Sequence, residues 1–175
     1  VQMCIRDSVY RGCNRHGSCR GIGGILQKNT EIEPLFWQKK SLLEMNDAEW
    51  EALCDGCGKC CYRKYIQGRG KRERFYYTRV ACNLLDVNTG RCTHYADRFK
   101  REPDCTKLTK KNLPDFGWLP KTCAYRLLYE GKSLFDWHPL ISHDPESVKK
   151  ANILIPKGIH EKEVIDWFEF VIDEV

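Results

Sequence analysis

The sequence predicts an α+β fold: a small cysteine-rich, metal-stabilised domain with short helices and a β-hairpin. The first observation behind this is the run 54–61, where four cysteines fall within eight residues with the spacing Cys-x-x-Cys-x-x-Cys-Cys. The second is a turn signal at 87–90 between two strand-like segments, which predicts a β-hairpin. The third is the length of 175 residues, which suits one domain.

Residues 1–30 differ from the rest of the chain. They are rich in Gly, Arg and Cys and show no period of 2 or 3.6. We therefore expect 1–30 to be a non-native or disordered extension, and 31–175 to be a single CxxCxxCC metal-binding domain. The alternative, a second metal site in which Cys4, Cys13 and Cys19 join His16, matches no common ligand spacing. Without the extension, eight of the eleven cysteines remain.

Two capping signals follow in close succession. Ser41-Leu-Leu-Glu44 and Asn46-Asp-Ala-Glu49 each have the pattern of a capping box at a helix start. The second predicts a short helix over about 47–53 that delivers Cys54. The run 54–61 is expected to be a loop or an irregular turn, because its two glycines disfavour a regular helix.

The middle of the chain has strand signals. Residues 75–80 are rich in aromatic and β-branched side chains, which predicts a strand. Segments 83–86 and 91–95 flank the turn and complete the predicted hairpin. This arrangement places Cys82 and Cys92 near the open ends of two paired strands.

The second half of the domain predicts further short elements. We expect helices over 95–101 and 106–111, and a third that begins with Thr122 as N-cap and Cys123 at its first position and stops near Gly131. A thiolate at Cys123 would be favoured by that helix N-terminus. Segment 132–160 is expected to be a surface arm, and the chain end a short helix or closing strand.

The cysteine run is better explained by ligation than by packing. Cysteines that serve as small core residues scatter, whereas thiolates that converge on a metal cluster in this way. The odd total of eleven disfavours complete disulfide pairing, and we see neither a secretory signal nor an apolar stretch of the roughly 18 residues that span a membrane. We therefore expect reduced thiols in a cytoplasmic protein.

The spacing bears on the kind of metal. A structural zinc ribbon usually has two separate Cys-x-x-Cys pairs. Three cysteines at intervals of three instead resemble the bacterial ferredoxin pattern, in which a distant cysteine completes a cubane cluster. The spacing thus favours a 4Fe-4S cluster, with a zinc ion as the alternative. Cys54, Cys57 and Cys60 are the primary ligand candidates.

Cys61 is harder to place. Adjacent side chains of an extended chain point to opposite sides, so Cys60 and Cys61 would not easily serve one ion. Cys61 then either binds a second centre or is a spare redox thiol. Eight thiols permit two four-ligand sites, but spacing does not divide them, and it leaves ligand and packing roles equally open for Cys82, Cys92, Cys105 and Cys123.

Other features carry less information. His94, His138 and His143 could join a metal site, although histidines in loops usually do not. Segment 62–82 holds seven Lys and Arg against one acid, which is more often a solvated loop than a nucleic-acid surface. No Walker loop, dinucleotide-binding pattern, nucleophile elbow or zincin motif is present.

Several motifs together carry a family resemblance. They are Phe-Trp-Gln-Lys-Lys at 36–40, Asn-Asp-Ala-Glu-Trp-Glu at 46–51, Cys-Asp-Gly-Cys-Gly-Lys-Cys-Cys at 54–61, Tyr-Tyr-Thr-Arg-Val-Ala-Cys at 76–82, Pro-Asp-Cys-Thr-Lys-Leu-Thr at 103–109, Trp-Leu-Pro-Lys-Thr-Cys-Ala-Tyr-Arg-Leu-Leu at 118–128 and Asp-Trp-His-Pro-Leu at 136–140. From about 34 to 167 the chain resembles the bacterial YcgN family, within the YkgJ-like group whose CxxCxxCC domain is described as zinc- or iron-chelating. The resemblance implies that all eight cysteines, 54, 57, 60, 61, 82, 92, 105 and 123, belong to one metal-binding pattern. It does not supply an activity.

Three functions follow as hypotheses. The first is a bacterial cytoplasmic metal-binding protein that holds zinc or an iron–sulfur cluster, with no protein partner indicated. The second is a redox or protein-modifying, methyltransferase-like iron–sulfur enzyme, which relatives in the wider group suggest. Against it, the sequence offers no general base, substrate pocket or cofactor motif. The third is a nucleic-acid-binding module that uses 63–79.

Overall fold

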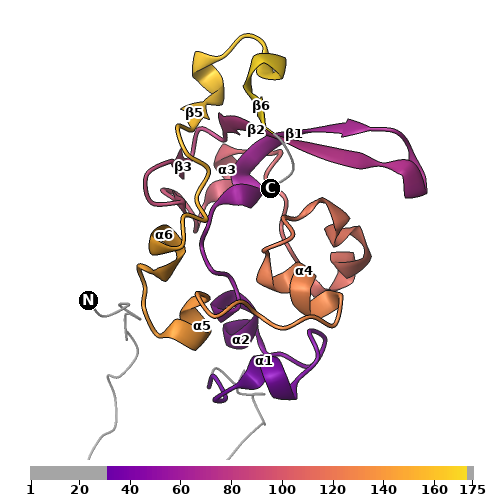
Figure 1. Ribbon diagram of the computed structural model, residues 1–175, viewed down its shortest axis with the longest axis vertical. Helices are drawn as coiled ribbons and strands as arrows, with labels where there is room; N and C mark the ends of the chain where they lie inside the picture. The colour runs from indigo at the N-terminus through magenta and orange to yellow at the C-terminus, as the bar shows by residue number, and fades with distance from the viewer. Residues whose placement is uncertain (1–30, 173–175) are drawn as a thin grey trace, which may run out of the picture.

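A computed structural model describes residues 31–172 of the chain. The predicted α+β class is confirmed: short helices surround a small mixed sheet and a separate two-stranded hairpin. Figure 1 shows helices α1 and α2 at one end of the molecule and the sheet at the other, with the cysteine run between them. The boundary proposed at residue 30 lies outside the described residues and stays a prediction.

The N-terminal helices are short. Helix α1 spans Phe36–Lys39 and α2 spans Asp47–Ala52. Asn46 caps α2 with the predicted capping box, in which its side chain accepts from the Glu49 amide and Glu49 returns a bond to the Asn46 amide. The signal at Ser41–Glu44 was wrong as a helix start. Glu44 does bind the Ser41 amide, at 2.8 Å, but the segment forms a single turn.

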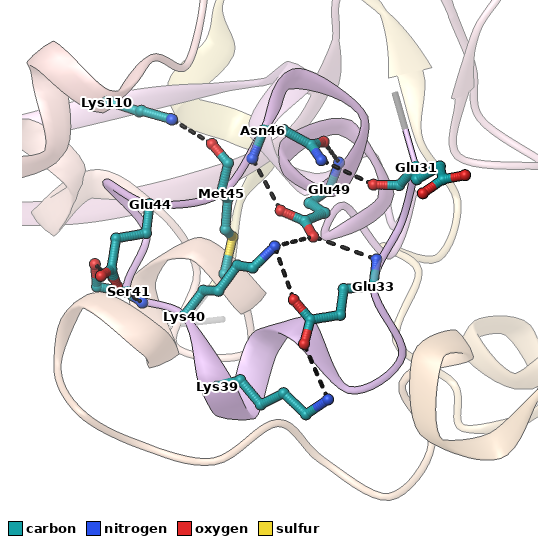
Figure 2. Close-up of polar contacts among 10 residues, drawn as sticks. All are labelled: Glu31, Glu33, Lys39, Lys40, Ser41, Glu44, Met45, Asn46, Glu49 and Lys110. Carbon is teal, nitrogen blue, oxygen red and sulfur yellow. Dashed lines mark hydrogen bonds and ion pairs between the residues drawn. The ribbon is translucent and has the colours of Figure 1, made fainter. Parts of the chain in front are cut away.

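Glu49 is fully buried and organises this end of the protein. Its carboxylate accepts from Lys40 Nζ at 2.7 Å and from the amides of Asn46 and Glu33, at 2.9 and 3.3 Å. Lys40 also contacts the Glu33 carboxylate at 3.0 Å. Figure 2 shows these groups converging on Glu49. The network fastens the incoming chain to α2, and α2 leads directly into the cysteine run.

The larger sheet is built around strand β2. Strands β1 (Tyr62–Gln67) and β2 (Arg74–Ala81) form an antiparallel hairpin. On its other side, β2 pairs in parallel with β5 (Ile159–His160) and antiparallel with β6 (Val171–Ile172). Figure 1 shows the tip of the β1–β2 hairpin extending away from the body of the protein. The strand expected at 75–80 is therefore confirmed.

The basic segment is not the solvated loop that its composition favours. It forms β1, a 3₁₀ turn at Gly70–Arg72 and the start of β2. Arg63 pairs with the carboxylates of Glu161 and, at 3.7 Å, Glu102. At least one of its cations is thus used in internal contacts.

The second hairpin is shorter than predicted. It consists of β3 (Leu85–Asp86) and β4 (Arg91–Cys92). Helix α3 occupies Arg98–Arg101, within the predicted range. The helix expected at 106–111 was wrong: the 3₁₀ segment η3 begins at Lys110 and runs to Trp118, with Thr109 and Asn112 forming its capping box. The helical segment starts after Thr109 rather than at Thr106, because the Thr109 amide donates to the Asn112 side chain at 2.7 Å.

Helix α4 spans Ala124–Tyr129, one residue later than predicted. Cys123, rather than Thr122, is the N-cap, and the hydroxyl of Thr122 is buried without a hydrogen-bond partner among the described residues. Gly131 follows the helix with a φ of +70° and supports the predicted stop.

The segment expected to be a surface arm is partly packed. It contains α5 (Pro139–Ser142) and α6 (Ser147–Lys150), and it buries Leu134, His138 and Ile155. The chain end was expected to be a short helix or a closing strand, and it contains both. The 3₁₀ turns η4 (Glu161–Glu163) and η5 (Trp167–Phe170) precede the strand β6.

Two separate apolar clusters hold the described residues together. The first, here called the helical core, gathers the helices and η3: Phe36, Leu42, Met45, Trp50, Leu53, Leu113, Phe116, Leu119, Ala124, Tyr125, Leu127 and Leu134. The second, the sheet core, is smaller: Tyr62, Tyr77, Ala81, Leu85 and Ile155. The cysteine run is the segment that leads from one core to the other.

Replacing the buried carboxylate tests the polar network at α2. Glu49→Gln is expected to lower the free energy of unfolding by roughly 1–3 kcal/mol at neutral pH, because the amide loses the charge that Lys40 faces. Burial opposes ionisation of Glu49, yet the bonds from Lys40 and the two amides outweigh it and lower its pKa below 4.5. The difference from wild type should therefore be full above pH 4.5 and shrink as pH falls through the lowered pKa.

Glu169→Gln, at an exposed site on η5, is the matched control and should change stability little. Denaturant unfolding followed by circular dichroism measures both variants. Equal stability of Glu49→Gln and wild type across this pH range would contradict the assigned role of the network.

Candidate metal centre

The cysteine run begins where α2 ends. The Cys54 amide still donates to the Glu51 carbonyl, at 3.3 Å, and the chain then leaves the helix. Residues 54–58 form a loop, and Lys59–Cys61 form one 3₁₀ turn, η1. The prediction of a loop or irregular turn is confirmed. The loop presents Cys57 to the interior and Cys54 and Cys60 toward solvent.

Two glycines allow this loop to touch the second hairpin. Gly58 has a φ of +68°, and a Cβ at that position would lie 2.6 Å from the Gly90 carbonyl oxygen. Gly90 has a φ of +71°, and a Cβ there would lie 2.8 Å from the Gly56 carbonyl oxygen. The left-handed conformation and the backbone contact both exclude a side chain at these positions. The contact brings the cysteine run against the β3–β4 turn.

Six of the eight cysteines line one pocket of about 120 Å³: Cys54, Cys60, Cys61, Cys82, Cys92 and Cys105. Its wall also includes the aromatic rings of Trp50, Tyr95 and Tyr125, and the charged groups of Arg98 and Glu102. The run 54–61, the residue after β2, strand β4 and the segment after α3 therefore contribute thiols to a common space, although these parts are far apart in the sequence.

The sheet junction explains how three of these thiols come together. The Cys82 amide donates to the Cys61 carbonyl at 2.8 Å, which continues the β1–β2 ladder by one step. The Leu85 amide donates to the Cys82 carbonyl at 3.0 Å, and Leu85 pairs with Cys92 across the second hairpin. The expectation that Cys82 and Cys92 lie near strand ends is confirmed.

Cys57 and Cys123 lie outside the pocket wall. Burial raises the pKa of both thiols above the ordinary value. The charges of Asp55 and Cys60 raise the pKa of each thiol further. Cys57 and Cys123 therefore interact electrostatically with Cys60, which does line the pocket. The helix N-terminus was expected to favour a Cys123 thiolate. The Arg126 amide does lower its pKa, but burial is the larger effect.

Cys60 and Cys61 are neighbours in space as well as in sequence. Their sulfur atoms lie 3.9 Å apart, close enough for one thiol to donate a weak hydrogen bond to the other. The alternation expected of an extended chain was wrong because both residues belong to a 3₁₀ turn. The shared bond lowers the pKa of Cys60 to about 7 and raises that of Cys61.

Backbone amides point at several of the sulfur atoms. The Leu84 amide donates to Cys82 Sγ at 3.5 Å, two residues along the chain. Amides of Gly56 and Lys59 have the same two-residue relation to Cys54 and Cys57, and they lower the pKa of those thiols. Hydrogen bonds to sulfur stabilise thiolates, which is the form that binds metals.

Burial and nearby charges act on the thiols in opposite directions. Although Cys54 is exposed as a residue, its sulfur lies among the atoms of the pocket wall, and this desolvation raises its pKa to about 12. The carboxylate of Asp55 raises it further, whereas Arg91 lowers it. Asp55 itself is buried, and its Oδ2 has no hydrogen-bond partner among the described residues.

Lys64 is a cation that sequence reasoning did not assign to the site. Its ammonium donates to the Cys60 carbonyl at 3.1 Å and to the Tyr62 carbonyl at 2.7 Å. Burial lowers the pKa of Lys64 to about 8, while the charges of Cys60 and Cys61 oppose that change. Its place in the basic run, next to the cysteines, is the signal that could have identified it.

The three histidines do not join the thiols. His138 is buried, its Nε2 lies 3.2 Å from the Leu53 carbonyl, and its Nδ1 accepts from the Leu140 amide. Nε2 therefore holds the start of α5 against the end of α2, and Nδ1 caps α5 itself. His94 and His143 are exposed.

The donor chemistry of the site fits a metal, but the donors line a space and do not converge on one point. Within residues 31–172, no three Cys, His, Asp or Glu side chains are already gathered as a metal-binding set. Soft thiol donors, amides aimed at sulfur and a buried carboxylate oxygen without a partner suit zinc or an iron–sulfur cluster. The sulfur atoms would have to move inward to hold either.

Comparison with known proteins identifies the class. The CxxCxxCC family model, described as a "putative zinc- or iron-chelating domain", matches residues 53–124. All eight cysteines discussed above lie within that range. Residues 53–124, which include the cysteines of the thiol-lined pocket, are therefore similar to the CxxCxxCC domain.

Relatives identify the family. A UPF0260 protein of Haemophilus influenzae (strain ATCC 51907 / DSM 11121 / KW20 / Rd) is 74% identical over 149 residues, which are 85% of this chain and 97% of the relative. The UPF0260 protein YcgN of Salmonella newport (strain SL254) is 49% identical over 140 residues, 79% of this chain and 90% of the relative. The chain belongs to the UPF0260 family, and the resemblance to YcgN is confirmed. No solved structure matches it.

The described helices give no sign of a membrane span. In residues 31–172 none of them has the length and apolar character needed to cross a bilayer.

The contact between the loop and the hairpin turn gives a testable prediction. Gly58→Ala should lower the free energy of unfolding by roughly 1–3 kcal/mol, because the methyl group would meet the Gly90 carbonyl and the backbone would be strained. Gly117→Ala is the matched control, since a Cβ there meets nothing within 4 Å. Denaturant titration measures both variants, and equal stability of the two would show that the contact is dispensable.

Proposed function

We propose that this protein binds metal through the eight cysteines of its CxxCxxCC domain, as a zinc ion or an iron–sulfur cluster. The observation that carries the proposal is the pocket: six thiols from four separate segments line it, and the other two are coupled to its edge. Packing alone gives no reason to gather thiols from the run 54–61, the residue after β2, strand β4 and the segment after α3 in one place.

The amides directed at sulfur support the same proposal. They lower the pKa of Cys54 and Cys57, but burial and neighbouring thiolates keep the pKa of each above the ordinary value. Several thiolates crowded around one space repel one another, and a bound cation removes that repulsion. A metal would therefore stabilise both the ionised thiols and the elements that carry them.

The triplet spacing favours a 4Fe-4S cluster over zinc, since three cysteines at intervals of three bind one cubane in ferredoxins. Zinc would act chiefly as a structural ion that links the two small cores. Either centre requires reduced thiols, which fits a cytoplasmic protein.

Anaerobic purification tests the proposal. A brown protein that absorbs broadly in the visible range and contains stoichiometric iron and sulfide would identify a cluster. A colourless protein with stoichiometric zinc would identify a zinc site. Absence of metal from both aerobic and anaerobic preparations, and after incubation with zinc or with iron and sulfide, would refute the proposal.

A single substitution tests the run itself. Cys57→Ser is expected to reduce the metal content sharply, because the serine hydroxyl is a poor ligand for soft metals. Cys57 is buried and central in the run. The matched control is Ser147→Ala. It removes a buried hydroxyl that has no hydrogen-bond partner among the described residues, and it should leave the metal content unchanged. Full retention of metal by Cys57→Ser would remove that residue from the site.

A further inference from the structure

We propose that the eight cysteines form two metal centres of four thiolates each. One consists of Cys54, Cys57, Cys60 and Cys123, and the other of Cys61, Cys82, Cys92 and Cys105. This inference rests on the proposed function and adds the number of centres and the division of the ligands between them. The boundary between the two centres falls at the peptide bond that joins Cys60 to Cys61.

The second group is fastened together by the backbone of the sheet. Cys61 and Cys82 are joined by an amide–carbonyl bond of 2.8 Å, and Cys82 is joined through Leu85 to Cys92. These bonds fix three of the four residues at one end of the two hairpins. All four members of the group line the pocket.

Cys105 enters the second group through Glu102. The Cys105 amide donates to the Glu102 carbonyl at 3.0 Å, and the carboxylate of Glu102 lies 3.9 Å from Cys82 Sγ. Burial raises the pKa of Cys105, and so do the charges of Cys82, Cys60 and Cys92, whereas Arg98 lowers it. Glu102 thus contacts both Cys105 and Cys82 and links Cys105 to the thiols at the end of the sheet.

The first group is held by contacts between helices. Cys54 follows α2, and Cys123 caps α4. The two helices are tied where Tyr125 Oη donates to the Trp50 carbonyl at 2.7 Å, with the two rings 4.7 Å apart. Burial, then the charges of Asp55, Cys54 and Cys60, raise the pKa of Cys123, so the distant cysteine lies near the triplet.

One member of each group packs against a different core. Cys123 packs against the helical core, whereas Cys61 packs against the sheet core. The charge of Cys60 affects thiols of both groups. It raises the pKa of Cys54 in the first group and of Cys61 and Cys105 in the second. A division at the bond between Cys60 and Cys61 therefore follows the architecture of the fold.

The division also explains the doubled cysteine. The sulfur atoms of Cys60 and Cys61 are 3.9 Å apart, so two centres that each take one of these sulfurs would be close neighbours. The competing arrangement is a single centre in the shared pocket, with Cys57 and Cys123 as bystanders. The two arrangements differ in the number of ions bound and in which cysteines are needed.

Cobalt(II) titration of the reduced full chain under anaerobic conditions distinguishes them. Two ions per chain are expected, each with the intense visible d–d bands of tetrahedral thiolate coordination. Native mass spectrometry counts the ions. Electron paramagnetic resonance should show magnetic interaction between the two ions, because their ligands include adjacent sulfur atoms.

Variants assign the ligands. Cys123→Ser and Cys105→Ser should each bind about one cobalt per chain and lose the magnetic interaction, and the double variant should bind about none, as expected for independent four-thiolate sites. Cys57→Ser and Cys92→Ser provide a second member of each group should one variant fail to fold. Replacing Cys4, Cys13 and Cys19 together with serine is the control and should leave two ions bound.

A wild-type chain that binds one cobalt overturns the inference while the proposed function stands. So does full retention of both ions by the Cys123 and Cys57 variants, which would remove these two cysteines from the ligand set. A chain that takes up no metal at all instead refutes the proposed function itself.

Discussion

The path of the loop between α2 and β1 is the constraint on which the rest of the structure depends. This loop leads from the helical core to the sheet core, and it must pass the β3–β4 turn at backbone distance. A Cβ on Gly58 would lie 2.6 Å from the Gly90 carbonyl, so the contact requires glycine. Because the loop is held there, its thiols face those of the second hairpin. The sulfur-lined pocket is a consequence of this approach.

The sheet core is small and by itself stabilises the sheet only weakly. Its core contains five buried residues, against twelve in the helical core. Small cores of this kind are commonly reinforced by disulfides or metals, and the eight described cysteines are all free thiols. Six of them line the pocket beside the run that leads from one core to the other. We therefore expect metal binding to contribute directly to folding, as it does in small zinc domains.

The sequence was most informative where a short-range rule decides the structure. The capping box at Asn46, the loop at 54–58 and the hairpin turn all follow from local signals, and all were confirmed. The strand β1 was missed because it begins a segment rich in Lys and Arg, and pairing with β2 overrides the preference of these side chains for solvent. The pocket was beyond local reasoning, since it depends on a loop–hairpin contact between residues about thirty positions apart. Lys64, by contrast, contacts the Cys60 and Tyr62 carbonyls close by in the sequence, and its position beside the run was the signal that could have identified it.

The last cysteine of the run differs structurally from the three before it. Cys54, Cys57 and Cys60 belong to the segment that leaves the helical core, whereas Cys61 is already bonded through its carbonyl to the end of β2. Two centres that share this junction would couple the two cores through one peptide bond, and loss of either centre would weaken the link between them. In that arrangement the metal determines how the helical and sheet parts are joined, and the doubled cysteine is the residue pair that joins them.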